Sequence, residues 1–141
     1  MNTSSRFAVA IHVLTLLTYY RDEPLTSEFI AESVNTNPVV IRRSLGALRD
    51  AHLVSSHSGN GGGWQLLRSP EAITLSDVYR VVEMQALFPL PISSPNPECV
   101  VGHSIQQALD GYFKEIEEVL EERLAQRTIA QMLESVLSWS G

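Results

Sequence analysis

Apolar residues recur at intervals of three and four over most of this chain, which predicts a mainly α-helical protein. Such intervals place side chains on one face of a helix. Residues 3–20 follow the pattern, and shorter stretches follow it at 28–34 and 38–50. The first stretch predicts a buried helix with the apolar members Phe7, Ile11, Leu14 and Leu17.

Two short helices separated by a tight turn are predicted next. Thr26 and Ser27 are both good N-caps for the stretch 28–34, because their hydroxyl oxygens accept from the free N–H groups of a first helical turn. Three polar residues then interrupt the apolar spacing. Asn37 and Pro38 restart a helix, since Asn caps well and Pro suits the first helical position. This order predicts a helix-turn-helix.

The second of these helices has distinct faces. Ile41, Leu45 and Leu48 form its buried stripe, and Arg42 and Arg49 flank that stripe. At about 100° per residue, four side chains point outward. They belong to Val39, Arg43, Gly46 and Asp50.

The three arginines of this helix have two interpretations. Single arginines usually belong to a solvated face, but a cluster on the second helix of a helix-turn-helix favours contact with double-stranded DNA. Arg43 is the candidate for a base edge, because an arginine can bind guanine in a bidentate manner. Arg42 and Arg49 are better placed for phosphates, and Asn37 is better explained as a cap. A helix in the major groove reads bases mainly with its N-terminal residues. Those residues here are Thr36, Asn37, Val39, Arg42 and Arg43.

Two strands with a glycine-rich connection predict a wing. The strands are expected at 53–57 and 64–67, and the connection 58–63 holds four glycines, which allow positive φ angles. A phosphate-binding loop is excluded, because the glycines lack a Gly-Lys-Ser/Thr ending and a following helix. A plain hairpin turn is the alternative, but such a turn needs only about two residues. The longer tip suggests that it reaches something beyond the body, for which DNA is the candidate. The candidates are His57, Ser58, Gly59, Asn60 and Gly61.

The C-terminal half predicts a short helix, a loop and two more helices. Thr74 and Asp77 resemble a capping box with Asp in place of Glu, and they open a helix to about Glu83. Residues 85–101 contain four prolines and are expected to be a loop. A long helix to about residue 125 and a final helix at about 128–137 follow.

The long helix has one apolar stripe, from Ile105 to Leu124. About 24 helical residues extend about 36 Å, more than a domain of this size easily buries. An intramolecular core would explain the stripe, but a homodimer interface is favoured, because two-fold proteins match two-fold operators. The predicted fold is mainly α with a small β-hairpin wing, a winged helix-turn-helix with a long C-terminal dimerisation helix. Its parts are a DNA-binding domain at 1–84, a proline-rich loop at 85–101 and dimerisation helices at 102–141.

The net charge of −6 is unusual for a DNA-binding protein. The acidic residues are concentrated in the second half. Residues 1–70 have six Arg and five Asp or Glu, a net charge of +1, and residues 71–141 have a net charge of −7. The first half is still only weakly basic, so nonspecific DNA binding should be weak and salt-sensitive.

One cysteine, Cys99, allows no intrachain disulfide and fits a reducing cytoplasm. The apolar residues 7–11 resemble the start of a secretion signal. His12 and Thr15 interrupt that run, and no suitable cleavage site precedes Arg21. The run is also too short to span a bilayer. A cytoplasmic protein without a membrane segment is therefore expected.

The segments 53–66 (LVSSHSGNGGGWQL) and 68–78 (RSPEAITLSDV) resemble a family of bacterial regulators. The family includes the iron–sulfur cluster regulator, the nitric-oxide-sensitive repressor and the cysteine metabolism repressor. Its wing typically reads GGY-x-L, followed by I-T-L-x-D-V. The start Arg6-Phe7-Ala8 and the long C-terminal helix also fit. The resemblance covers nearly the whole chain and implies a dimeric winged-helix transcription factor, usually a repressor, with Arg6 among its DNA contacts.

Two departures from this family matter. Its wings often carry Arg where this chain has Ser58, which weakens the case for a charged minor-groove contact. Its cluster-binding members carry three cysteines before the long helix, whereas this chain has only Cys99. One thiolate per chain cannot supply the usual cluster ligands, so no cofactor is expected.

Cys99 is a candidate sensor. Asn96 and Pro97 repeat the cap-plus-proline start, which could place Cys99 in a first helical turn, where the helix dipole lowers a thiol pKa. Glu98 works against this effect. Cys99 and His103 share an i,i+4 face, a weak metal-ligand signal. An inert cysteine is an equal alternative, and the loop could instead frame a pocket for a small-molecule effector.

The favoured function is a DNA-binding transcriptional regulator, a homodimeric repressor that responds to a redox or small-molecule signal. An enzyme is not expected, because no nucleophile, base and orienting group occur together. The alternative is a winged-helix protein–protein interaction module, which the overall acidity suggests. A salt-dependent DNA shift assay would separate the two.

Overall fold

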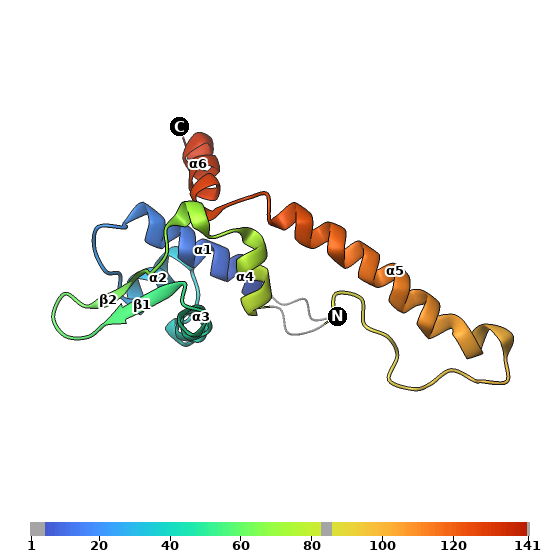
Figure 1. Ribbon diagram of the computed structural model, residues 1–141. Coiled ribbons are helices and arrows are strands. Elements are labelled where there is room, and N and C mark those ends of the chain that lie inside the picture. The colour runs from blue at the N-terminus through green and yellow to red at the C-terminus, as the bar shows by residue number, and fades with distance from the viewer. Residues whose placement is uncertain (1–4, 83–85, 141) are drawn as a thin grey trace.

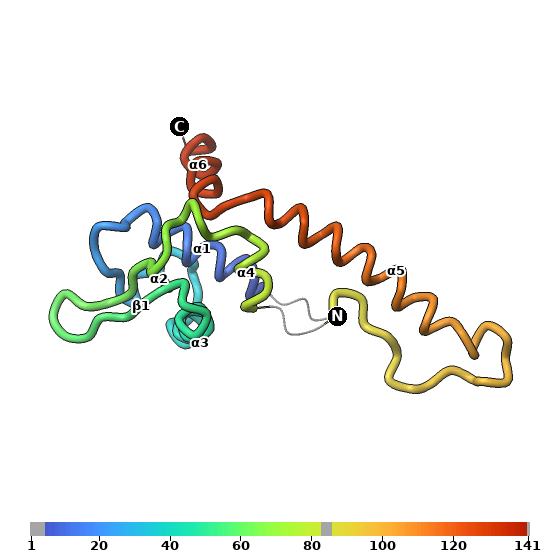
Figure 2. The backbone as a smooth tube through the Cα atoms, viewed as in Figure 1, coloured from blue at the N-terminus to red at the C-terminus, as the bar shows by residue number. Residues whose placement is uncertain are grey.

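The computed structural model describes residues 5–82 and 86–140, and it consists of a helical body with one projecting helix (Figure 1). The body contains the wing and all the helices except α5. The helix α5 and the wing extend from opposite sides of this body (Figure 2). The fold is therefore mainly helical with a two-stranded wing, as the sequence predicts.

The helix-turn-helix is confirmed. α1 spans Arg6–Tyr19, α2 spans Ser27–Val34 and α3 spans Pro38–Asp50. Of the two candidate caps of α2, Thr26 is the one used: its Oγ1 accepts from the N–H of Phe29 at 3.1 Å. Asn35 ends α2 in the left-handed region at φ 61°, a conformation that Asn tolerates well. Asn37 then caps α3, because its Oδ1 accepts from the N–H of Val39 at 2.8 Å.

The wing consists of β1 (Val54–His57) and β2 (Gly63–Leu66), which pair antiparallel. Each strand lies within one residue of its predicted position. Val54 is opposite Leu66, and His57 is opposite Gly63. Gly59 and Gly61 have φ angles of 89° and 76°, so the tip uses the positive φ angles that glycine allows.

Two capping boxes fix the helices after the wing. A short 3-10 helix, η1 (Pro70–Ala72), leads into α4 (Leu75–Val82). In the predicted box, the Thr74 N–H donates to Asp77 Oδ2 at 3.0 Å, and the Asp77 N–H donates to Thr74 Oγ1 at 3.1 Å. Thr128 and Gln131 form an equivalent box before α6 (Ile129–Ser140). The predicted end of α4, Glu83, lies outside the described residues.

The hydrophobic core lies between α1, α2, α3, α4, the base of the wing and the start of α6. Its α6 member is Ile129, which is fully buried. The Ile129 N–H donates to the carbonyl of Ile73 at 2.9 Å, so the start of α6 is also tied to the segment before α4. α6 therefore packs on the body, chiefly against α1 and η1. The largest fully buried side chains in the rest of the core are Leu14, Leu17, Ile30, Ile41, Leu45, Leu48, Leu53 and Ile73.

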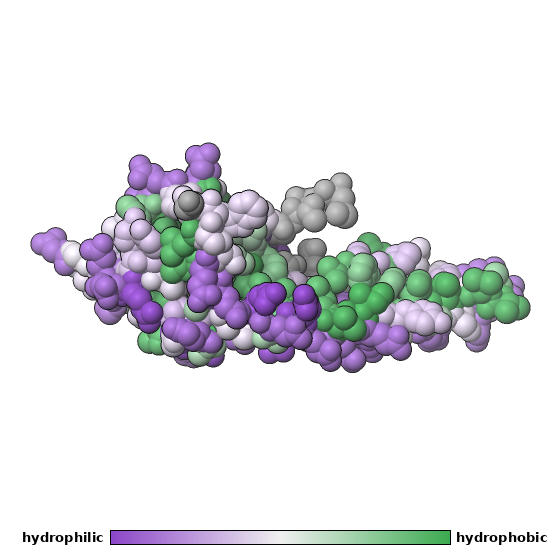
Figure 3. All heavy atoms as spheres, turned by 90° about the horizontal axis from the view of Figure 1, so that it is seen from above, coloured by the Kyte–Doolittle hydropathy of each residue, from purple (hydrophilic) through white to green (hydrophobic). Residues whose placement is uncertain are grey.

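α5 spans Val100–Leu124 and contains no buried residue. It begins two residues before residue 102, the expected boundary of the dimerisation helices. Two contacts join α5 to other segments. The ring of Phe88 in the proline-rich loop lies 5.0 Å from that of Phe113, and Arg80 of α4 pairs with Glu121 at 3.6 Å. Apolar residues run along the projecting helix (Figure 3). Among the described residues, no helix is long and apolar enough to cross a membrane.

Candidate nucleic-acid interface

The helix α3 presents the outward face that its sequence predicts. Ile41, Leu45 and Leu48 are fully buried, and they hold the helix against the body. Val39 and Arg43 are exposed on the outward face. Because the cap of Asn37 fixes the start of α3, the first turn has a defined position from which its side chains can reach a groove.

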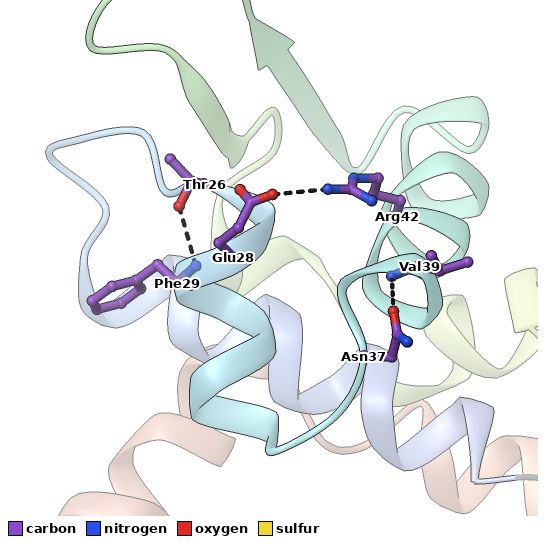
Figure 4. A network of polar contacts seen from close by, with 6 residues as sticks. All are labelled: Thr26, Glu28, Phe29, Asn37, Val39 and Arg42. Carbon is purple, nitrogen blue, oxygen red and sulfur yellow. Dashed lines mark hydrogen bonds and ion pairs between the residues drawn. The ribbon is translucent and has the colours of Figure 1, made fainter.

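The three arginines of α3 differ in their partners. Arg42 Nη2 lies 2.8 Å from Glu28 Oε2, and the two side chains point toward each other across the gap between α2 and α3 (Figure 4). Arg49 Nε lies 3.8 Å from Asp50 Oδ1. Within residues 5–82 and 86–140, the side chain of Arg43 forms no hydrogen bond or ion pair. Arg43 therefore has all its donors available for a base edge.

A cleft of about 390 Å³ connects α3 with the start of α1. Arg6 and Arg43 both line it, together with Ser44, whose buried Oγ has no hydrogen-bond partner among the described residues. The structure thus brings Arg6, implied by the family resemblance, together with Arg43, inferred from the helical pattern. The rest of the lining is mainly apolar and includes Val9, Val40 and Val82.

The predicted wing contacts are all exposed. His57 ends β1, and the tip residues 58–61 extend beyond the body (Figure 1). Gly62 turns the tip back toward the strand, and a Cβ there would lie within 2.3 Å of the His57 carbonyl oxygen. Close backbone packing therefore explains why this position of the tip is a glycine.

Trp64 also belongs to the candidate interface, a position that the sequence analysis did not predict. The guanidinium of Arg49 lies 5.9 Å from the centre of the Trp64 ring, a distance at which a cation and an aromatic face attract. Trp64 thereby links the base of the wing to the last turn of α3. An aromatic residue beside a glycine-rich turn is the sequence signal that could have indicated it.

The candidate sensor Cys99 is exposed at the start of α5. It occupies the N-cap position, one residue before the helical turn in which it was expected. Its thiol makes no capping hydrogen bond, yet the nearby backbone N–H groups of Gly102 and then Val101 lower the pKa of Cys99, against a smaller effect of desolvation. His103 is linked to Cys99 through the helix backbone, its N–H donating to the Cys99 carbonyl at 2.8 Å.

A groove of about 400 Å³ lies between the proline-rich loop and α5. It is close to Cys99 in sequence and offers both apolar and polar side chains. Its lining includes Leu90, Pro95, Pro97, His103, Gln106 and Asp110.

Comparison with known proteins identifies the family. Residues 3–135 match the model of the Rrf2 family, which is described as iron-dependent transcriptional regulators. The chain belongs to the Rrf2 family. It is therefore a DNA-binding transcriptional regulator of the helix-turn-helix type, and not a member of an enzyme family.

Individual Rrf2 relatives agree with this assignment. The chain is 42% identical over 130 residues to YwnA of Bacillus subtilis, described as an HTH-type transcriptional regulator, and the match covers 92% of this chain and 96% of YwnA. A crystal structure described as a DNA-binding protein is 40% identical, with a TM-score of 0.75 over 92% of this chain and 99% of that one. The structure of CymR, the global cysteine regulator of B. subtilis, is 22% identical and shares the fold, with a TM-score of 0.72 over 96% and 98% of the two chains.

The iron in the description of the Rrf2 family does not fit the donors of this chain. Its only cysteine is Cys99. Residues 5–82 and 86–140 contain no group of three or more His, Cys, Asp or Glu side chains placed to hold a metal ion. A cluster of the usual kind needs several thiolate ligands. Iron therefore has no role in the function proposed for this chain.

Proposed function

We propose that this Rrf2-family regulator is a homodimeric repressor that binds operator DNA with α3 and the wing of each protomer and works in the cytoplasm. The observation that carries the proposal is the outward face of α3, where Arg43 is exposed and unpaired among the described residues. α3 would lie in the major groove, with the wing on the adjacent backbone. The proposed contacts are Arg6, Thr36, Asn37, Val39, Arg42, Arg43, Arg49, His57, Ser58, Gly59, Asn60 and Gly61.

The homodimer is supported by the unpartnered face of α5. No residue of this helix is buried, and Tyr112 and Val119 are 63% and 65% exposed. Val101, Ile105 and Ile116 are exposed on the same face. Such a long apolar stripe on one helix is typical of an interface between helices. A second copy of α5 would cover it and place two α3 helices on a two-fold operator.

The signal is proposed to act at the start of α5. Cys99 is exposed there and its pKa is lowered, which favours the thiolate, the nucleophilic form of a cysteine. The neighbouring groove could hold a small-molecule effector instead. Either event would move the first turn of α5 and so change the spacing of the two reading helices. The repressor assignment rests on the family resemblance.

The DNA contact is tested by selecting duplexes from a random pool and measuring their binding by fluorescence anisotropy. Arg43→Ala should weaken binding to the best selected duplex by roughly 1–3 kcal/mol. Arg127→Ala is the matched control, because it removes the same charge in the turn between α5 and α6. Equal, small losses for both variants would count against α3 as the reading helix.

A further inference from the structure

We propose that Glu28 acts as an internal anion that occupies Arg42 and thereby weakens the binding of this protein to nonspecific DNA. The inference rests on the proposed function of α3 as the DNA-reading helix. It concerns a residue of α2 whose carboxylate lies among the groups proposed to face DNA, although its negative charge opposes DNA binding.

The local structure places the Glu28 carboxylate opposite Arg42. Thr26 caps α2, so Glu28 lies in the first helical turn, where the positive end of the helix dipole stabilises a carboxylate. From there Glu28 Oε2 accepts from Arg42 Nη2 at 2.8 Å (Figure 4). This distance is typical of a charge-assisted hydrogen bond between an arginine and a carboxylate.

The pair is accessible to DNA. The side chains of Arg42 and Glu28 are 52% and 65% exposed, and exposed ion pairs are weak. A phosphate that is well placed against the guanidinium can therefore replace the carboxylate. A loosely bound duplex offers no such fixed phosphate, so in a nonspecific complex Arg42 stays with Glu28.

The effect of this exchange is large relative to the net charge of the first half of the chain. Residues 1–70 have a net charge of only +1. Arg43 has no partner among the described residues and is ready for any duplex, whereas Arg42 becomes available only when a phosphate displaces Glu28. Glu28 thus suppresses one phosphate contact in nonspecific complexes and leaves it available where α3 fits its groove.

The test measures binding of the full chain to a short random-sequence duplex over a range of NaCl concentrations. Glu28→Gln keeps the shape of the side chain and removes its charge. The matched control is Glu32→Gln, one turn further along α2, which changes the net charge equally. Glu32 is exposed and forms no ion pair among the described residues. Circular dichroism checks that both variants keep the fold.

The Glu28→Gln variant should bind the random duplex about two- to fivefold more tightly than the Glu32→Gln variant. Its plot of log affinity against log salt should be steeper by about 0.9, the value of one added phosphate contact. Adding Arg42→Ala to Glu28→Gln should remove both differences, because the released guanidinium is their source.

Three results would overturn the proposal. If both glutamine variants bind alike, Glu28 has no special effect and only net charge matters, while the proposed DNA-binding function stands. If the gain persists without Arg42, the released group is a different one. If the wild-type chain binds no duplex at any salt concentration, the proposed function fails, and this inference fails with it.

Discussion

Leu25 and Trp64 exchange two backbone hydrogen bonds, from the Leu25 N–H to the Trp64 carbonyl at 3.0 Å and from the Trp64 N–H to the Leu25 carbonyl at 2.7 Å. This bridge joins the segment before α2 to the first residues of β2. Because Trp64 also faces Arg49 of α3, the wing and the helix-turn-helix share one rigid connection. The relative position of the two proposed DNA contacts therefore depends on the backbone at the base of the wing.

Gly63 is the residue at which this connection can be broken. Its φ is 150°, and a Cβ there would lie 2.5 Å from the Leu25 carbonyl oxygen. Gly63→Ala should therefore lower the free energy of unfolding by roughly 1–3 kcal/mol and weaken DNA binding, because the wing is displaced. Urea unfolding and anisotropy measure the two effects.

Gly111→Ala is the control for this prediction. Gly111 lies in α5 with nothing within 4 Å of an added Cβ, so alanine there should be neutral or stabilise the helix by about 0.5–1 kcal/mol. A Gly63→Ala variant as stable as the control would show that the base of the wing tolerates a side chain.

Ile129 is predicted to contribute strongly to the stability of the fold, because it joins α6 to the hydrophobic core. It is fully buried, so Ile129→Ala should lower the free energy of unfolding by about 2–5 kcal/mol. Trp139→Ala in the same helix is the control, because that side chain is 90% exposed. Urea unfolding at one fixed protein concentration compares the variants. Equal stabilities would mean that α6 contributes little to the core.

The proposed dimer is tested on the exposed stripe of α5. Ile116 and Val119 are 48% and 65% exposed, so placing Glu at both positions should leave the protomer folded and prevent association, because charge would be buried at the interface. Ser104→Glu with Gln107→Glu adds the same charge at two exposed positions off the stripe. Sedimentation at micromolar concentration should show a monomer only for the first variant. A monomeric wild-type chain would refute the dimer.

Local features of the fold were predictable from the sequence, because each depends on neighbouring residues. The caps at Asn37 and Thr74 use partners two and three positions away. Two of the tip glycines, Gly59 and Gly61, adopt the positive φ angles of the turn. A related signal, Thr-x-x-Gln, occurs at Thr128 and also marks the start of a helix.

The candidate site also contains contacts between residues far apart in the sequence, which a periodic pattern of apolar residues does not reveal. Arg42 and Glu28 are 14 residues apart on different helices, and Arg49 meets Trp64 only after the wing has folded back. The helical pattern identified all three arginines of α3 but could not show that Arg43 alone among them lacks a partner within the described residues. The DNA contacts themselves remain predictions.

The reactivity of Cys99 should depend on pH in a way that reflects its position. The N–H groups of Gly102 and Val101 lower its pKa, so the thiolate forms at a lower pH in the folded chain than in the unfolded chain. Because the thiolate is the nucleophile, the alkylation rate should rise at a lower pH in the native protein than in denaturant. Iodoacetamide labelling followed by mass spectrometry measures both profiles on the same cysteine.

If Cys99 is also the sensor, its oxidation must alter DNA binding. No second cysteine in the chain can resolve a sulfenic acid, so the oxidised thiol would persist or form a mixed disulfide with another molecule. Peroxide should therefore weaken operator binding by the wild type and leave Cys99→Ser unaffected, with thiol reductant restoring the wild type. Equal losses in both proteins would exclude Cys99 and favour an effector in the groove beside α5, where a bound molecule would act on the same first turn.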